Sequence, residues 1–179
     1  MSTTGAPIEQ EASSQEATPE PASSVWRWWK SLASEDRAGR AELRRCGTVG
    51  DVAFTASYHR LLQWLGSRLG EGDARRVAVA AAVLAHVEKE PRERTSLASQ
   101  MARPKGDAQG AAVSDARFRH LLRNEEPDDM LRELVRAVRQ LDRSASVDRL
   151  FIDVVRWDER TRSRWARDYY EALPSKKKA

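Results

Sequence analysis

The sequence has little of the material from which disulfide frameworks and metal sites are built. Its 179 residues include one cysteine, Cys46, and three histidines, His59, His86 and His120. A single cysteine cannot close an internal disulfide, which fits a reducing compartment, and we therefore expect a cytoplasmic protein. One cysteine and three scattered histidines also leave little for a zinc site. The sequence thus predicts no metal site and no cofactor.

Long hydrophobic runs are missing as well. The longest apolar run extends from Val77 to Val87, contains five alanines among eleven residues and includes a histidine. A helix that spans a membrane needs roughly 20 apolar residues. The N-terminus lacks the basic start and apolar centre of a secretory signal peptide. We therefore expect neither a membrane span nor a signal peptide.

The familiar motifs of catalysis are also absent. The glycines at Gly66, Gly70 and Gly72 resemble a phosphate-binding loop, but no Lys-Ser or Lys-Thr follows them and no strand precedes them. There is no His-Glu-x-x-His or Cys-x-x-Cys pair. Cys46 is better explained as a small, buried residue at a helix end than as a nucleophile. The sequence therefore predicts a protein that is not an enzyme.

Charge is distributed unevenly along the chain. The 31 Lys and Arg residues exceed the 27 Asp and Glu residues, which gives a net charge of +4. Residues 1–24 hold glutamates but no Lys or Arg, and they have too few large apolar side chains to offset the entropy of ordering. We predict a disordered acidic tail over 1–24 and a basic tail over 174–179. The body between these tails is moderately basic.

The body shows the periodicity of helices. Apolar residues recur every three or four positions, and no alternating run of strand length appears. We predict an all-α protein of about eight helices in two packed bundles, over 25–103 and 114–173, joined by a loop over 104–113. Thr48 and Asp51 resemble a capping box. The helix after it is predicted to carry one apolar stripe from Val52 through Phe54 to Leu69.

Arginines supply the strongest functional signal. At about 100° per residue, the helix that begins near Asp115 places Phe118 on one face and Arg119 and Arg123 on the other. Arg117 lies at the border of these faces. Fixed cations at this spacing suit a phosphate backbone, although a solvated helix face is the alternative interpretation.

Further arginines occur near the C-terminus and on the helix predicted over 129–141. Arg160 and Arg162 belong to the first group, where acidic residues are available to neutralise several cations. Arg136 lies on the polar side of the 129–141 helix, and Arg143 follows it. A separate aromatic cluster near the N-terminus could stack on bases, but its helical spacing is more typical of a core or a partner interface, and we assign it to a partner interface. Its members are Trp26, Trp28 and Trp29.

Three segments in order resemble one known family. They are ELRRCGTVGDV at 42–52, RFRHLLR at 117–123, and WDERTR running into WARDYY at 157–170. These segments, their spacing and the all-helical pattern resemble the CasB family across Val25 to Leu173. The acidic N-terminal tail is outside the resemblance.

The resemblance implies a role in antiviral defence. CasB proteins are the small, all-helical, non-catalytic subunit of the type I-E CRISPR effector complex, Cascade. Its partners would be the guide-RNA-bearing backbone subunits, the large subunit, a second copy of itself, the guide RNA, and the target and non-target DNA strands. Basic residues of the family are thought to hold the displaced non-target strand and to face the target strand, which stabilises the R-loop.

The resemblance also implies which cations matter. The positions that match by sequence are Arg45, Arg117, Arg123, Arg136, Arg160 and Arg162. Arg119 departs from the family pattern and rests on the helical-wheel argument, and Arg143 is added from its place after the predicted helix. A free-standing helical nucleic-acid-binding protein and a purely structural helical adaptor remain the alternatives.

Overall fold

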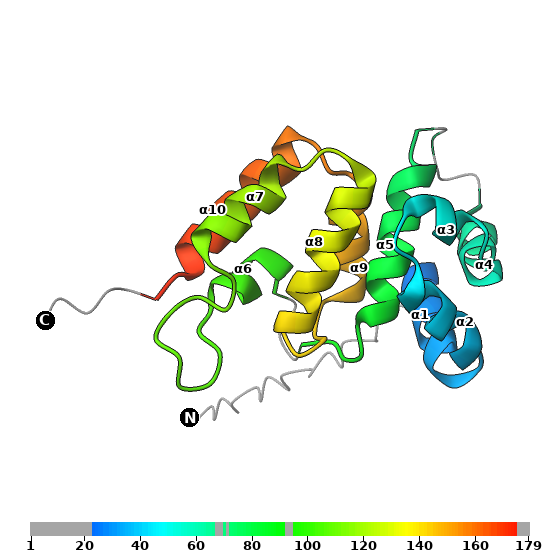
Figure 1. Ribbon diagram of the computed structural model, residues 1–179, viewed down its shortest axis with the longest axis horizontal. Helices are drawn as coiled ribbons and strands as arrows, with labels where there is room; N and C mark the ends of the chain where they lie inside the picture. The colour runs from blue at the N-terminus through cyan, green and yellow to red at the C-terminus, as the bar shows by residue number, and fades with distance from the viewer. Residues whose placement is uncertain (1–22, 67–69, 71, 92–94, 175–179) are drawn as a thin grey trace, which may run out of the picture.

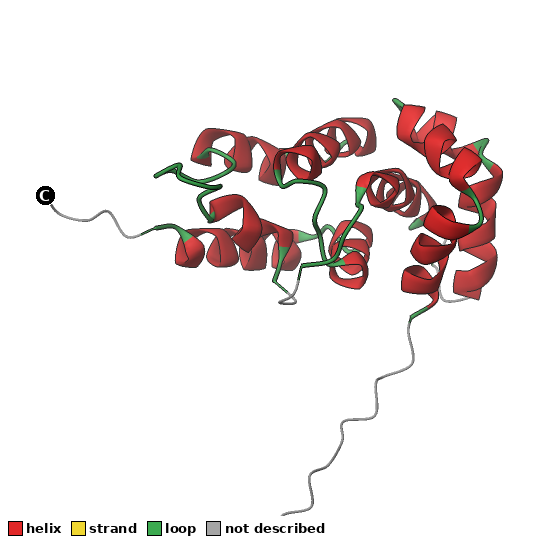
Figure 2. Cartoon of the chain, turned by 90° about the horizontal axis from the view of Figure 1, so that it is seen from below, coloured by secondary structure: helices red, strands yellow, loops and turns green. Residues whose placement is uncertain are grey.

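The computed structural model describes residues 23–66, 70, 72–91 and 95–174. Residues 1–22 of the acidic tail predicted over 1–24, Leu69, and residues 175–179 of the predicted basic tail lie outside the described residues. Within the described ranges the regular structure is entirely helical, so the all-α prediction is confirmed (Figures 1 and 2). The helices are α1 (Ser24–Ser34), α2 (Arg37–Arg45), α3 (Val49–Ala53), α4 (Ala56–Leu65), α5 (Ala74–His86), α6 (Leu97–Ala102), α7 (Asp115–Arg123), α8 (Pro127–Gln140), α9 (Val147–Val155) and α10 (Glu159–Ala172).

Capping residues explain where several helices begin. The Thr48 side chain accepts a hydrogen bond from the Asp51 backbone, and the Asp51 carboxylate accepts one from the Thr48 backbone, which forms the predicted capping box of α3. Pro127 occupies the first turn of α8, where its missing N–H costs nothing. None of the described helices has the length and apolarity needed to cross a membrane.

The prediction of one continuous helix after Thr48 is wrong. The structure divides it into α3 and α4, because the Thr55 hydroxyl accepts a hydrogen bond from the Tyr58 backbone at 3.3 Å and begins a new helix. Phe54 lies in the break between the two helices and is 90% exposed. It therefore does not belong to the apolar stripe.

Helix α5 is the centre of the fold. Its residues from Val77 to His86 are all buried, and it packs against α2 and α3 on one side and α8 and α9 on the other (Figure 1). Alanines at many of these positions allow the neighbouring helices to approach closely. This packing fixes the positions of α2 and α8 relative to one another.

The described helices before and after the predicted loop share one core. Helix α6, which precedes the loop, packs against α10, and α5 packs against α8 and α9. The buried apolar residues of both halves form one cluster. A domain boundary at 104–113 stays a prediction.

Two of the three N-terminal tryptophans are core residues. Trp28 and Trp29 are 1% and 4% exposed. Their Nε1 atoms donate to the Ser57 carbonyl at 2.9 Å and the Val87 carbonyl at 3.0 Å. The predicted partner interface is therefore wrong for these two, because their side chains hold α1 on the rest of the core. Trp26 is half-buried and donates to Glu90 at 3.0 Å, and a partner role for it stays a prediction.

Candidate nucleic-acid interface

Four of the eight predicted arginines form no ion pair with the described residues. Arg45, Arg117 and Arg160 are exposed, and their side chains form no hydrogen bond or ion pair there. Arg123 is also exposed and only donates from Nε to the Arg119 carbonyl at 3.2 Å. These four guanidinium groups keep their donors available for an external anion.

Arg119 differs from its neighbours on α7. Its guanidinium pairs with Asp115 at 2.6 Å and donates to the Tyr170 hydroxyl at 3.2 Å. The Tyr170 hydroxyl in turn donates to Asp115 at 2.6 Å. Hydrogen bonds from Tyr170 and Arg119 lower the pKa of Asp115, so this carboxylate stays ionised and offsets the Arg119 charge.

The other three predicted arginines also have acidic partners. Arg136 pairs with Glu133 at 2.8 Å, one turn away on α8. Two partners come from distant parts of the chain: Arg143 pairs with Glu88 at 2.7 Å, and Arg162 with Glu125 at 2.9 Å. All three arginines are at least partly exposed, although Glu133 is mostly buried. Exposed pairs contribute only about 0–1 kcal/mol. Arg143 and Arg162 can therefore exchange partners at little cost.

Aromatic packing holds the arginines of α7 in place. The Phe118 ring stacks on Tyr169 of α10 with centroids 3.9 Å apart and planes 8° apart. Both rings are fully buried, and the Tyr169 hydroxyl donates to the Val113 carbonyl at 2.7 Å just before α7. Because α7 is fixed on α10, Arg117 and Arg123 project from a rigid support.

One arginine of α10 has a structural role. Arg164 pairs with Asp153, which is 2% exposed and accepts a hydrogen bond from Trp165 Nε1 at 2.7 Å. Burial raises the pKa of Asp153, and the bond from Trp165 and the Arg164 charge oppose that rise. Arg164 thus compensates a buried carboxylate, whereas Arg160, one turn earlier, remains available.

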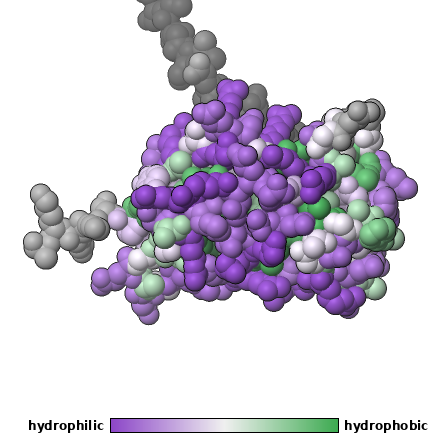
Figure 3. Space-filling model, turned by 45° about the horizontal axis from the view of Figure 1, so that its top comes forward, coloured by the Kyte–Doolittle hydropathy of each residue, from purple (hydrophilic) through white to green (hydrophobic). Residues whose placement is uncertain are grey.

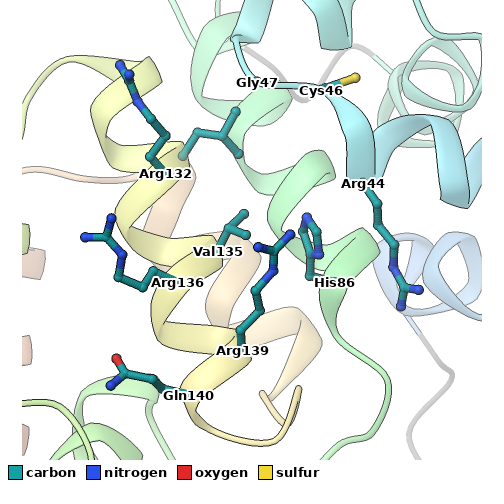
Figure 4. Close-up of a pocket in the computed structure, with 10 residues that line it drawn as sticks. Arg44, Cys46, Gly47, His86, Arg132, Val135, Arg136, Arg139 and Gln140 are labelled. Carbon is teal, nitrogen blue, oxygen red and sulfur yellow. The ribbon is translucent and has the colours of Figure 1, made fainter.

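A cleft between α2, α5 and α8 collects further cations (Figure 4). Its volume is about 490 Å³. We call it the arginine cleft, and its lining residues are Arg44, Cys46, Gly47, His86, Leu131, Arg132, Val135, Arg136, Arg139 and Gln140. Of the predicted residues only Arg136 lines it. The spacing of Arg132, Arg136 and Arg139 indicates a shared helix face, but only the fold shows that α2 and α5 complete a cleft there.

Arg44 forms one wall of the arginine cleft. Its Nε donates to the Ala85 carbonyl at 2.7 Å, and it pairs with Glu88 at 3.0 Å. Burial on its own would raise the pKa of Glu88. Hydrogen bonds and charge from Arg143 and Arg44 outweigh this effect, so the pKa is lowered. The neighbouring Arg45 does not line the cleft, as expected for adjacent residues of a helix.

His86 is the buried polar group of the arginine cleft. Its side chain is nearly enclosed, at 4% exposed, and forms no hydrogen bond with another described residue. Burial, followed by the charges of Arg139 and Arg44, lowers its pKa from 6.5 to about 4. The imidazole is therefore neutral at pH 7, and it lies beside the Arg139 guanidinium (Figure 4).

Cations on α8 form the opposite wall. Arg139 is exposed and has no hydrogen bond or ion pair with the described residues. Arg132 pairs with Asp129 at 2.8 Å, in addition to the Arg136 pair with Glu133.

The molecular surface in Figure 3 is mostly hydrophilic with small apolar patches. No cluster of three potential metal ligands occurs in the described part of the chain.

Comparisons with known proteins identify a family and a solved structure that are similar to this chain. A family model described as CRISPR-associated protein Cse2 matches residues 39–170. The chain is also similar in fold to a protein in the crystal structure of Escherichia coli Cascade bound to a PAM-containing double-stranded DNA target. That match has a TM-score of 0.66 and 16% sequence identity, and it covers 85% of this chain and 97% of the other. A search of curated proteins found no match.

Proposed function

Because the chain belongs to the Cse2 family of CRISPR-associated proteins, also called CasB, we propose that it stabilises the R-loop of a type I-E Cascade complex, of which it is the small subunit. Its surface arginines contact the displaced non-target strand and face the target strand through phosphates, without reading sequence. The protein carries out no catalysis. Its partners are the other Cascade subunits, a second copy of itself, the guide RNA and both DNA strands, and it acts in the cytoplasm.

The observation that carries this proposal is the set of exposed arginines without acidic partners. Arg117 and Arg123 lie six residues apart, about 1.7 helical turns, on a helix fixed by aromatic packing. R-loop formation is nearly balanced in energy, because the heteroduplex is about as stable as the duplex that it replaces. A few added phosphate contacts are therefore enough to shift the balance. A moderate net charge of +4 suits weak binding by the isolated subunit, which the assembly strengthens.

Charge reversal tests the proposal in the assembled complex. We expect Arg117→Glu combined with Arg123→Glu to leave assembly intact and to shorten the R-loop lifetime at least about fivefold at physiological salt, because two phosphate contacts become repulsive. The matched control is Arg27→Glu combined with Arg37→Glu, since both arginines are exposed, on α1 and α2, at the other end of the molecule from α7 (Figure 1). R-loop lifetimes are measured on a labelled target duplex.

Two outcomes would favour the alternatives. An assembled double variant with a normal R-loop lifetime would support a purely structural adaptor. Tight, sequence-selective DNA binding by the isolated protein would support a free-standing nucleic-acid-binding protein.

A further inference from the structure

The arginine cleft has the features of a site for a single unstacked nucleotide. Resting on the proposed function, we propose that one base of the bound single strand enters this cleft, while the adjoining phosphates lie on Arg132 and Arg136 of α8. This site would be distinct from the α7 surface that carries Arg117 and Arg123. It would let the strand be held by a base as well as by phosphates, with little preference for sequence.

The size and floor of the cleft suit a base. Its volume of about 490 Å³ lies within the range of small-ligand sites, roughly 300–1,000 Å³. Leu131 and Val135 supply apolar surface at the lining, and Gly47 contributes no side chain on the opposite wall. A phosphate alone needs no apolar floor. An unstacked base needs an apolar surface, because both of its faces lose their stacking neighbours when it leaves the strand's base stack.

His86 supplies a polar contact that the protein itself leaves unused. Its imidazole is 4% exposed, lines the cleft and has no hydrogen-bond partner among the described residues. Because it is neutral at pH 7, it offers one donor and one acceptor. Its ring nitrogens are not among the fully enclosed side-chain atoms that lack a partner, so they reach the surface of the cleft, where a ligand can bind them. A donor and an acceptor together match the edge of a base better than they match an anion.

The rim provides planar cations. Arg139 has no acidic partner and lies beside His86 (Figure 4), so its guanidinium plane is available to stack on a base. Arg132 and Arg136 are one helical turn apart, about 6 Å along the axis. The pair of Arg132 with Asp129 is exposed and weak, so a phosphate can replace this carboxylate at little cost. Arg136 is 59% exposed, so its guanidinium can contact a phosphate while it stays paired with the mostly buried Glu133.

Two oligonucleotides of equal charge test the base contact. The full-length protein is titrated at low salt with a fluorescent 12-residue oligothymidylate and with an abasic oligomer of the same length. We expect about tenfold weaker binding of the abasic strand, since one stacked base contributes on the order of 1–3 kcal/mol and 1.4 kcal/mol is tenfold. The variant Val135→Phe fills the cleft, and it is expected to bind both strands with the weaker affinity. Leu62→Phe is the matched control, on a partly buried residue of α4 outside the cleft lining.

The His86 imidazole provides a second readout at the cleft. Its NMR signals are assigned with His86→Gln, because the sequence has only three histidines. We expect these signals to move on addition of oligothymidylate and to stay in place with inorganic phosphate or the abasic strand.

The outcomes separate this inference from the proposed function. Equal affinity for both oligonucleotides with unchanged His86 signals would overturn the base site, while phosphate contacts and the R-loop role would stand. A response of His86 to inorganic phosphate alone would also overturn it, in favour of a simple anion site. No binding of either oligonucleotide by the protein, together with a normal R-loop in the Arg117→Glu, Arg123→Glu complex, would overturn both.

Discussion

The buried His86 makes stability depend on pH in a defined window. Its pKa is about 4 in the folded protein against 6.5 for an unperturbed histidine. Between these values the unfolded chain binds the proton and the folded chain does not, so the free energy of unfolding falls as the pH falls from 6.5 towards 4. Above pH 6.5 both states are neutral, and the effect disappears. Integration between pH 7 and pH 5 gives a loss of about 2 kcal/mol from this one group.

Denaturation by urea at pH 7 and pH 5 measures this loss. His86→Gln is the control, because glutamine has a similar reach and does not titrate. The comparison uses only the change in stability between the two pH values, so a difference between the proteins in absolute stability at pH 7 does not affect it. Contributions from other titrating groups occur in both proteins and cancel. We expect the wild type to lose about 2 kcal/mol more than the variant. Equal losses would refute the buried, neutral His86.

Two substitutions test the packing that supports the interface. Asp153→Ala leaves the Trp165 indole N–H and the Arg164 guanidinium without their buried acceptor. We therefore expect the free energy of unfolding, measured by urea denaturation at pH 7, to fall by about 3 kcal/mol. A fall of less than about 0.5 kcal/mol would contradict a buried ion pair. Gly39→Ala, at the start of α2, places a methyl group against the Ser57 hydroxyl of α4. We expect the free energy of unfolding to fall by about 1–3 kcal/mol in the same assay. Unchanged stability would show that α2 does not approach α4 so closely.

Local sequence signals predicted the elements of the second half well. Pro127 among acidic residues indicated the start of α8, and Asp158 with Glu159 indicated the start of α10. These signals work because helix termini are stabilised by the nearest few residues. The same rule explains the error at Phe54, where the N-cap preference of Thr55 outweighs an apolar spacing that favours one continuous helix.

The pairing of the arginines could not be predicted from the sequence. Arg162 meets Glu125 and Arg143 meets Glu88, partners that lie 37 and 55 residues away. Which carboxylate lies opposite a given cation depends on helix packing, so the sequence identified candidate cations without showing which remain unpaired. The arginine cleft was missed for the same reason, because α5 contributes His86 only once it packs between α2 and α8.

Cross-linking within the assembled complex tests the central claim most directly. A photo-reactive amino acid replaces His120, which is exposed on α7 three residues from both Arg117 and Arg123, so both arginines are retained. The complex is bound to a target duplex that carries a different label on each strand and is then irradiated. We predict cross-links to the displaced non-target strand that depend on R-loop formation. Cross-links only to protein subunits, with the R-loop fully formed, would contradict a strand-holding role for this surface.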